Sequence, residues 1–260
     1  MREKSIKLTT YLFFTISILL IVFPFVYLII EGLNLVPNLI RTEEVLFSIK
    51  LSMKTTSISS IIVMVIAIPT SIFLSSTESR LKRFFELILY IPMSLPHLVA
   101  GLALLYFFGQ TPIGNYLSNK LNLDFIFTVQ GIIIAQVFVN LPLALKNLID
   151  FLRKIDTEYY LVAKSYGADE WQIMKYVILP MMKKDILSTS LIVWYRAIGE
   201  FGAIMMLVGT TRFKTELIPT AIFLNMSTGD IDIAIALSVI LILLSAMVIS
   251  IYNLLGKSIE

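Results

Sequence analysis

The sequence predicts an all-α integral membrane protein with about six transmembrane helices. Hydrophobic residues make up 57% of the 260 residues and charged residues only 15%, whereas soluble domains contain roughly 45–50% and 25%. The apolar residues come in unbroken blocks, unlike the alternating pattern of an amphipathic surface helix. A block of about 20 apolar residues is long enough to cross the roughly 30 Å hydrocarbon core of a bilayer as a helix. The lipid bilayer is therefore the solvent that this composition requires.

Six segments reach that length. Five of them contain no Asp, Glu, Lys or Arg, and the segment 186–211 contains only Arg196 and Glu200. The five uncharged segments are 8–30, 55–77, 87–110, 125–145 and 233–256. The first follows a basic start, as a secretory signal does, but it is too long for a removable signal core and is predicted to be a retained helix. Pro92, Pro96 and Pro142 predict kinks, because proline removes an amide donor.

The distribution of lysine and arginine predicts the orientation. Six spans place both termini on one side, and that side carries fourteen of the cations whereas the other carries six. Arg196, inside a span, completes the twenty-one. Lys and Arg beside membrane spans are retained in the cytoplasm. We therefore expect a multi-pass protein of the cytoplasmic membrane with both termini in the cytoplasm.

The longest polar connection, 146–185, is cytoplasmic in this topology and has a helical pattern. Asp156 is a plausible helix cap and Gly167 a plausible helix stop. Asp169 and Gln172 then have the spacing of a capping box, which predicts that a second helix begins there. The connection is therefore expected to be a folded helical segment.

The chain shows no catalytic centre of its own. Residues 256–258 read Gly-Lys-Ser, but the position five before Gly256 is Ile251 instead of the glycine of a phosphate-binding loop. One histidine and no cysteine exclude a His/Cys metal site. A net charge of +3 is too small to indicate nucleic acid. We predict no cofactor, metal or nucleic-acid partner, and expect the energy for any transport to come from another subunit or from a gradient.

Three ionisable residues inside the spans are candidates for a translocation path. Arg196 and Glu200 lie four residues apart, so on one continuous helix they would share a face and neutralise each other. Such a pair either holds the bundle together or lines the route of a charged solute. His97 follows Pro92 and Pro96, and a broken helix near the middle of the membrane is where transporters often bind solutes. A carbonyl of a neighbouring helix could equally satisfy this histidine.

The cytoplasmic segment carries the most specific pattern. Residues 161–180 read LVAKSYGADEWQIMKYVILP, which resembles the signature of ABC importer permeases: Glu-Ala-Ala, three residues, Gly, nine residues and Ile-x-Leu-Pro. Val177 stands for the isoleucine, whereas Leu161 and Val162 depart from the first Glu and Ala. The departure removes an acidic residue that contacts the ATPase in other members, unless Glu158 or Asp169 substitutes for it. The resemblance assigns ATPase coupling to Ala163, Gly167, Ala168, Asp169, Leu179 and Pro180.

The resemblance continues towards the C-terminus. Residues 196–209, RAIGEFGAIMMLVG, look like the fifth span of permeases for molybdate, tungstate and sulfate, and residues 218–240 look most like the molybdate and tungstate branch. This implies the type I ABC importer permease fold, with an N-terminal helix and external loop at 1–47 and the permease domain at 48–256, including a coupling segment at 150–185. It also implies a homodimer, two ABC ATPase subunits and an extracytoplasmic binding protein that delivers the oxyanion.

Three alternatives stay open. A sulfate-type permease would show the same pattern. A secondary carrier that works alone would show inverted repeats and more paired ionisable groups within its spans, and neither is evident. An intramembrane enzyme would need a cluster of His, Asp or Ser at catalytic spacing, which the spans lack.

Overall fold

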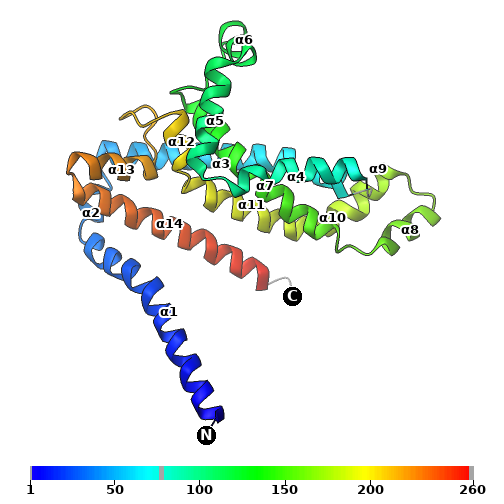
Figure 1. The fold of residues 1–260 in the computed structure, drawn as a ribbon, viewed down its shortest axis with the longest axis horizontal. Helices are drawn as coiled ribbons and strands as arrows, with labels where there is room; N and C mark the ends of the chain where they lie inside the picture. Colours follow the sequence, from blue (N-terminus) through cyan, green and yellow to red (C-terminus); the bar gives the residue numbers. More distant parts are fainter. Residues whose placement is uncertain (1, 76–78, 258–260) are drawn as a thin grey trace.

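The computed structural model describes residues 2–75 and 79–257, and within these ranges it is helical with no strand (Figure 1). The helices are α1 (Arg2–Leu33), α2 (Val36–Leu39), α3 (Glu43–Ser75), α4 (Arg80–Ser94), α5 (His97–Gln110), α6 (Pro112–Leu121), α7 (Val129–Leu152), α8 (Thr157–Ser165), α9 (Glu170–Ile173), a π-helical turn (Met174–Ile178), α10 (Leu179–Met181), α11 (Lys183–Ile198), α12 (Gly202–Leu207), α13 (Ile218–Thr228) and α14 (Ile231–Lys257).

The predicted membrane architecture is confirmed, with a different number of continuous spans. Four helices in the described part of the chain are long and apolar enough to cross a membrane, namely α3, α7, α14 and the part of α1 from Thr9. A fifth candidate is the pair α4 and α5, which bend by 112° at the break between them. The fifth predicted segment, 186–211, is divided between α11 and α12.

Helix ends shift where local chemistry outweighs hydropathy. The helix predicted from residue 55 begins at Glu43, because acidic residues in a first turn are favourable and Lys50 and Lys54 on α3 keep their ends exposed. The predicted end of this span, Thr77, lies outside the described residues. The span predicted from residue 125 begins only at Val129, where the hydroxyl of Thr128 accepts a hydrogen bond from the Gly131 amide at 3.2 Å.

The third and fifth predicted spans are interrupted helices. α4 ends at Ser94 and α5 begins after Pro96, whose backbone is extended with ψ of 136°. Proline has no amide to continue the helix, so the kink expected here is a complete break. The continuous helix predicted across Glu200 is wrong, because α11 ends at Ile198 and α12 starts at Gly202. α7, in contrast, continues through Pro142.

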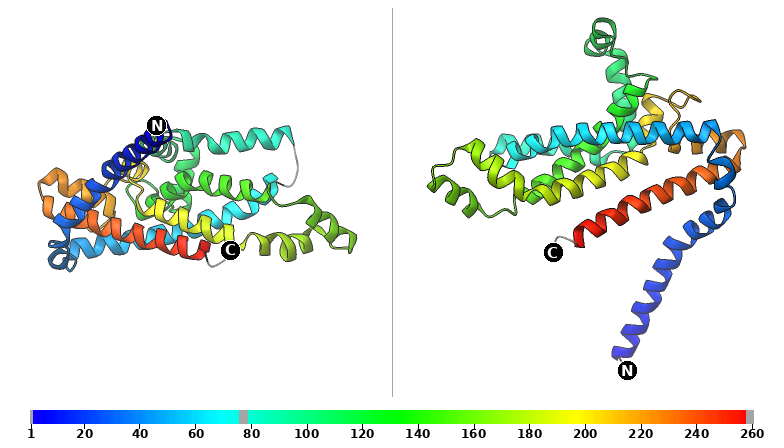
Figure 2. Two further views of the ribbon diagram at one scale, coloured as in Figure 1. Left: turned by 90° about the horizontal axis from the view of Figure 1, so that it is seen from below. Right: turned by 180° about the vertical axis from the view of Figure 1, so that it is seen from behind.

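The core lies between α3, α7 and α11, which pack side by side along the long axis (Figure 2). α3 contributes a buried row of small hydroxyl side chains that includes Ser52, Thr56 and Ser59. Small side chains allow close helix packing in membranes. The hydroxyls mostly bond to carbonyls of their own helix, as Ser59 does with Thr56 at 3.0 Å. The row therefore packs closely, and of its hydroxyls only that of Ser60 lacks a hydrogen-bond partner among the described residues.

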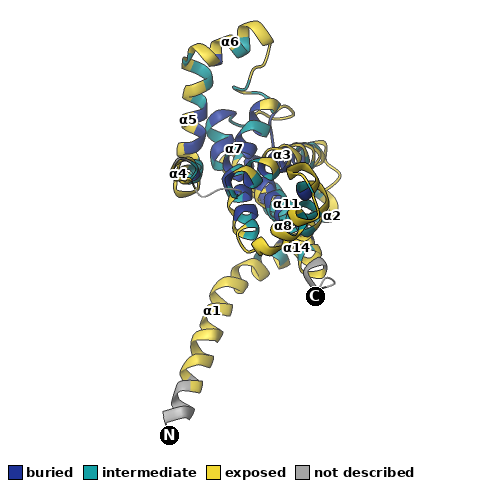
Figure 3. Cartoon of the chain, turned by 90° about the vertical axis from the view of Figure 1, so that its right-hand side faces the viewer, coloured by how far each residue is buried: buried dark blue, intermediate teal, exposed yellow. Residues whose placement is uncertain are grey.

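Two segments project from this bundle in different directions (Figures 1 and 3). α5 and α6 point away on one side, although the first half of α5 packs against α12 and α7. α1 points away on the other side and touches α14 only near its end, where a Cβ added to Gly32 would lie 2.4 Å from the side chain of Val239. None of the apolar membrane window of α1 is buried within the chain.

Candidate functional site

A helical hairpin, formed by α8 and α9, stands at the far end of the bundle from α13 (Figure 1). α8 begins as predicted at Asp156, whose carboxylate accepts the Glu158 amide at 3.0 Å. Gly167 ends it with φ of +83°, a left-handed conformation that glycine adopts without the steric cost of a side chain. The amides of Gly167 and Ala168 donate to carbonyls of the last turn of α8 at 2.9 and 3.1 Å.

The predicted capping box opens α9. Asp169 accepts the Gln172 amide at 2.8 Å, and the Gln172 side chain accepts the Asp169 amide at 2.9 Å. The π-helical turn that follows runs into Leu179 and Pro180, which lie on the connection to α11 and not at the hairpin tip. The structure therefore places Ala163, Gly167, Ala168 and Asp169 together at the hairpin turn, and separates them from the other two predicted coupling residues.

A polar cluster that sequence patterns do not reveal ties the two hairpin helices together. Glu170 of α9 accepts a hydrogen bond from the Tyr160 hydroxyl at 2.5 Å and pairs with Lys164 at 3.0 Å. Lys164 also lies over the Tyr160 ring, 4.9 Å from its centroid. The hydrogen bond from Tyr160, followed by the one from Lys164, lowers the pKa of Glu170. The hydrogen bond with Tyr160, followed by the one with Glu170, raises the pKa of Lys164. Both charges are therefore retained at neutral pH.

The hairpin exposes an unusual number of large apolar side chains. Tyr166, at the tip, is 88% exposed. The others are Tyr159, Leu161, Val162, Trp171 and Tyr176, and all of them are exposed. Large apolar side chains that are exposed together on one segment are typical of sites that contact a protein or a membrane. We call these six residues the hairpin patch.

A second cluster joins the two interrupted spans. His97 is the first residue of α5, and its Nδ1 lies 2.7 Å from the carboxylate of Glu200, in the break between α11 and α12. The other oxygen of Glu200 accepts the Ala203 amide at 3.0 Å, which satisfies a free donor at the start of α12. Glu200 is only 3% exposed, whereas the His97 side chain is 37% exposed. We call this cluster the break junction.

Close backbone contacts hold the same junction. A Cβ added to Gly101 of α5 would lie 2.5 Å from the Ala203 carbonyl oxygen, and one added to Gly202 would lie 3.0 Å from Cβ of His97. Backbone atoms cannot yield as a flexible side chain can, so α5 and α12 approach this closely only because glycine occupies these positions. The two interrupted spans are therefore packed directly against each other.

The predicted ion pair between Arg196 and Glu200 does not form. The helix ends between these residues, so they do not share a face, and Glu200 turns to His97 instead. Arg196 is exposed and has neither a hydrogen bond nor an ion pair with any residue that the structure describes. The break junction thus brings together His97 and Glu200. Arg196, four residues before Glu200 in the sequence, has no side-chain partner among the described residues.

Gln136 of α7 supports the break from inside the core. Its amide donates to the Ala197 carbonyl at 2.9 Å and lies 3.3 Å from the Thr56 hydroxyl. The Ala197 carbonyl lies in the last turn of α11, where it also accepts the Glu200 amide at 3.2 Å in place of a regular helical bond. An amide side chain in an otherwise uncharged span is the sequence signal for such a role, although it does not reveal the partner.

Taken together, the interrupted spans and the membrane-length helices are those of a multi-pass membrane protein. Residues 67–260 match the family model described as "Binding-protein-dependent transport system inner membrane component". The chain belongs to this family, which makes it a transport component of the cell membrane. The predicted ABC permease class and helical fold are therefore confirmed.

Curated relatives extend the match across most of the chain. The molybdenum transport system permease protein ModB of Mycobacterium bovis is 32% identical over 212 residues, which cover 81% of this chain and 80% of that protein. The molybdate/tungstate transport system permease protein WtpB of Methanocaldococcus jannaschii is 25% identical over 258 residues, covering 99% and 98%.

The fold also matches a solved structure. A chain in the crystal structure of a bacterial ABC transporter involved in the import of the acidic polysaccharide alginate superposes with a TM-score of 0.78. The alignment covers 100% of this chain and 97% of the other, at 18% sequence identity. At this identity the likeness concerns the fold alone.

Proposed function

We propose that this chain is the membrane-spanning permease subunit of an ATP-driven importer that takes molybdate or tungstate into the cell. The observation that carries the proposal is the similarity to the molybdenum and molybdate/tungstate permeases over at least four fifths of each chain. Sulfate is a related tetrahedral dianion, and it is the competing substrate that a test has to include.

In this proposal, ATP hydrolysis takes place on separate ABC ATPase subunits, and the hairpin couples it to the spans. The turn residues Ala163, Gly167, Ala168 and Asp169 would enter a cleft of the ATPase, while Leu179 and Pro180 would pass the movement to α11. The hairpin patch would supply the buried apolar surface of that contact. The side chain of Asp169 is already engaged in the capping box. Glu158, which is exposed, is therefore the better substitute for the family's missing acidic residue.

The translocation path is proposed to run past the break junction. An exposed cation at a hydrocarbon-facing position is costly, so Arg196 would face either a water-filled route or a second copy of the chain. His97 and Glu200 together carry no net charge when both are ionised, so His97 would offer a hydrogen-bond donor without holding a dianion strongly. Weak binding along the path is what release requires.

The same proposal also gives the orientation and the assembly of the permease. Both termini and the hairpin would lie in the cytoplasm, and an extracytoplasmic binding protein would deliver the oxyanion from the other side. Two copies would form the pathway, with residues 1–47 contributing a peripheral helix and external loop and residues 48–256 the permease domain. The unburied α1 is consistent with a second copy packing against it.

The test is a reconstitution of the tagged chain in liposomes with its ATPase and binding protein. Hydrolysis and uptake should rise when the binding protein is loaded with molybdate or tungstate, and sulfate should stimulate less. Uptake by the chain alone, with no ATPase, would overturn the proposal in favour of a secondary carrier. Stimulation by sulfate only would move the substrate to the sulfate branch.

A further inference from the structure

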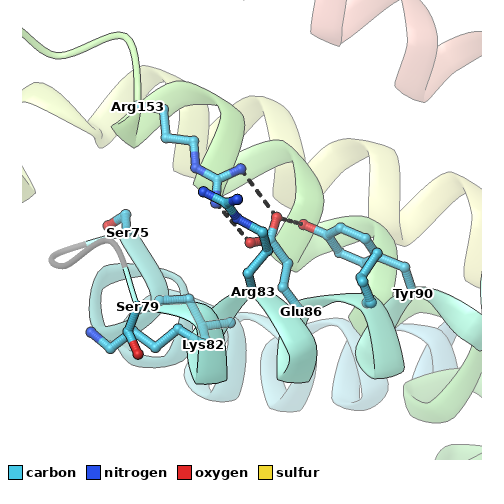
Figure 4. A pocket seen from close by; sticks show the side chains of 9 residues that line it. Ser75, Ser79, Lys82, Arg83, Glu86, Tyr90 and Arg153 are labelled. Carbon is cyan, nitrogen blue, oxygen red and sulfur yellow. Dashed lines mark hydrogen bonds and ion pairs between the residues drawn. The ribbon is translucent and has the colours of Figure 1, made fainter.

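A cavity of about 530 Å³ lies between the ends of α3, α4 and α7, at the hairpin end of the bundle (Figure 4). Its polar lining includes Ser79, Lys82, Arg83, Glu86, Tyr90 and Arg153. None of these residues belongs to the hairpin patch or to the break junction. The cavity is therefore separate from both parts of the proposed transport machinery.

Glu86 is buried in the wall of this cavity, and other side chains engage both of its oxygens. Arg153 of α7 donates to them through its two terminal nitrogens at 3.1 and 2.7 Å, and the Tyr90 hydroxyl donates at 3.1 Å (Figure 4). Such a two-pronged pair of Arg and carboxylate has a fixed geometry. Glu86 thus balances one cation and holds Arg153 at the cavity wall.

The cavity keeps an excess of positive charge. Three cationic side chains line it against the single carboxylate of Glu86. The guanidinium of Arg83 has no hydrogen bond or ion pair with any residue in the described ranges, and the Arg153 side chain remains 51% exposed. α4 begins at Arg80 beside the cavity, and the free amides of a helix start add positive partial charge. The arrangement supplies several donors for an anion.

The surface around the cavity is apolar and exposed. Leu87, which lines the cavity, is 65% exposed, and the neighbouring Phe73, Phe84 and Phe85 are exposed as well. These residues belong to α3, which is long and apolar enough to cross a membrane, and to α4, which is part of the bent candidate span. Cations at the ends of such helices would lie at the level of the polar headgroups. Cations above apolar side chains fit a ligand with a phosphate group and hydrocarbon tails.

We propose that this cavity binds the phosphate headgroup of an anionic phospholipid, with the acyl chains lying along the exposed apolar side chains of α4. Arg83 and Arg153 would contact the phosphate oxygens, and Glu86 and Tyr90 would keep Arg153 in place. The inference does not depend on which solute the protein transports, because it concerns a separate cavity at the membrane surface.

The experiment uses the purified full-length chain in a neutral detergent. Phosphatidylglycerol, phosphatidylcholine, inorganic phosphate and molybdate are titrated separately, and binding is followed by native mass spectrometry and by the melting temperature. Arg83→Gln removes the unpaired cation, and Arg80→Gln is the matched control, because Arg80 is also an exposed cation at the start of α4 but does not line the cavity. Melting without added lipid reports whether each variant is folded.

We expect phosphatidylglycerol to bind more tightly than phosphatidylcholine, and Arg83→Gln to weaken that binding about five-fold, as for the loss of one cation near an anionic lipid surface. Arg80→Gln should bind phosphatidylglycerol as the parent chain does. Equal effects of the two substitutions, or equal binding of the two lipids, would overturn the proposal. Binding of phosphate or molybdate with no preference for the anionic lipid would also overturn it and would identify a site for free oxyanions.

Discussion

The carboxylate of Glu200 has two partners that both depend on it. A carboxylate can only accept hydrogen bonds, so Nδ1 of His97 carries the hydrogen and the Ala203 amide supplies the second donor. Removing an acceptor at a buried position leaves its donors unsatisfied, and each such donor costs about 1–3 kcal/mol. Glu200 therefore stabilises the junction of α5 and α12 by contacting one donor from each helix.

Glu200→Ala should consequently lower the stability of the detergent-solubilised chain by about 1–3 kcal/mol, since it leaves the buried Ala203 amide without its acceptor, whereas the partly exposed His97 can bond to water. Glu200→Gln keeps an acceptor and should cost less. The measurement is thermal or denaturant unfolding followed by intrinsic fluorescence. Equal stability of the alanine variant and the parent chain would mean that the junction is not formed as described.

Glu216 offers a pH-dependent test in the loop that joins α12 to α13. Its side chain is fully buried, and one oxygen accepts the Phe213 amide at 3.3 Å. Burial raises the pKa of Glu216 above its ordinary value. A carboxyl with a raised pKa in the folded state contributes most stability below its unfolded pKa, and this contribution falls as the pH rises through the folded pKa.

The Glu216→Gln variant should therefore be more stable than the parent chain at pH 8 and should lose this advantage at pH 4. Glutamine keeps an acceptor for the Phe213 amide and carries no charge to desolvate. Melting temperatures across this range provide the comparison. An advantage that is the same at every pH would show that the titration of this carboxyl has no part in it.

Single residues show where sequence reasoning succeeds and where it stops. Asp156, Gly167 and the box of Asp169 and Gln172 were predictable, because helix ends depend on neighbours a few residues away. The partner of Glu200 was not, because i to i+4 spacing applies only while the helix continues. The tie between Tyr160 and Glu170 joins different helices, and short-range patterns contain no information about such contacts.

At the scale of elements, the hairpin is a small unit that lies at one end of the bundle (Figure 1). Its helices are too short to be stable alone, so the Tyr160, Lys164 and Glu170 contacts and the left-handed turn hold its shape. Its aromatic side chains, in contrast, are mostly exposed and do not pack into the hydrophobic core of the chain. The hairpin thus combines a shape fixed by polar contacts with an exposed apolar surface, as the proposed contact with an ATPase requires.

Substitution of Gly167 by a bulky residue should uncouple ATP hydrolysis from uptake while the spans stay inserted. Gly229 provides a matched control, since it also ends a helix, has φ of +90° and has open space where a Cβ would lie, but it sits at the opposite end of the bundle. Gly167→Leu should reduce co-purification of the ATPase and stimulated hydrolysis, whereas Gly229→Leu should leave the amount of bound ATPase unchanged. Equal loss in both variants would point to backbone strain alone.

Of the two interrupted spans, only the one with a break at Pro96 was predictable from the sequence. Proline at position 96 signals a break in any helix, and the structure has one there. The interruption after Ile198 has no proline. A hydropathy pattern does not predict this break, because the residues on both sides of it are mostly apolar. Two contacts stabilise the break: Gln136 of α7 donates to the Ala197 carbonyl, which is a tertiary contact, and the Glu200 side chain accepts the amide of Ala203 three residues further on.

For the whole molecule, the most conspicuous feature is a bundle with α1 standing apart from it (Figures 1 and 3). Hydropathy predicted that α1 spans the membrane but could not predict that the helix would leave its own bundle. Periodic patterns report which face of a helix is apolar, and α1 is apolar all round. Its neighbours are therefore set by lipid or by another chain.

A homodimer predicts that α1 touches a second copy. The chain contains no cysteine, so Leu20→Cys, at a strongly exposed position on α1, can be labelled with a thiol-reactive photo-crosslinker without background. Illumination of two differently tagged copies in a bilayer should give a product that carries both tags. Only singly tagged products, together with a native mass of one copy, would contradict the dimer.

The contact of Gly101 with Ala203 sets a limit on how this protein can move. The close approach of the two backbones leaves little room for one helix to move into the other, and the contact of His97 Nδ1 with the Glu200 carboxylate joins the two segments at the same point. α5 and α12 are thus expected to shift as one rigid body. A single spectroscopic probe on either helix would then record the displacement of both.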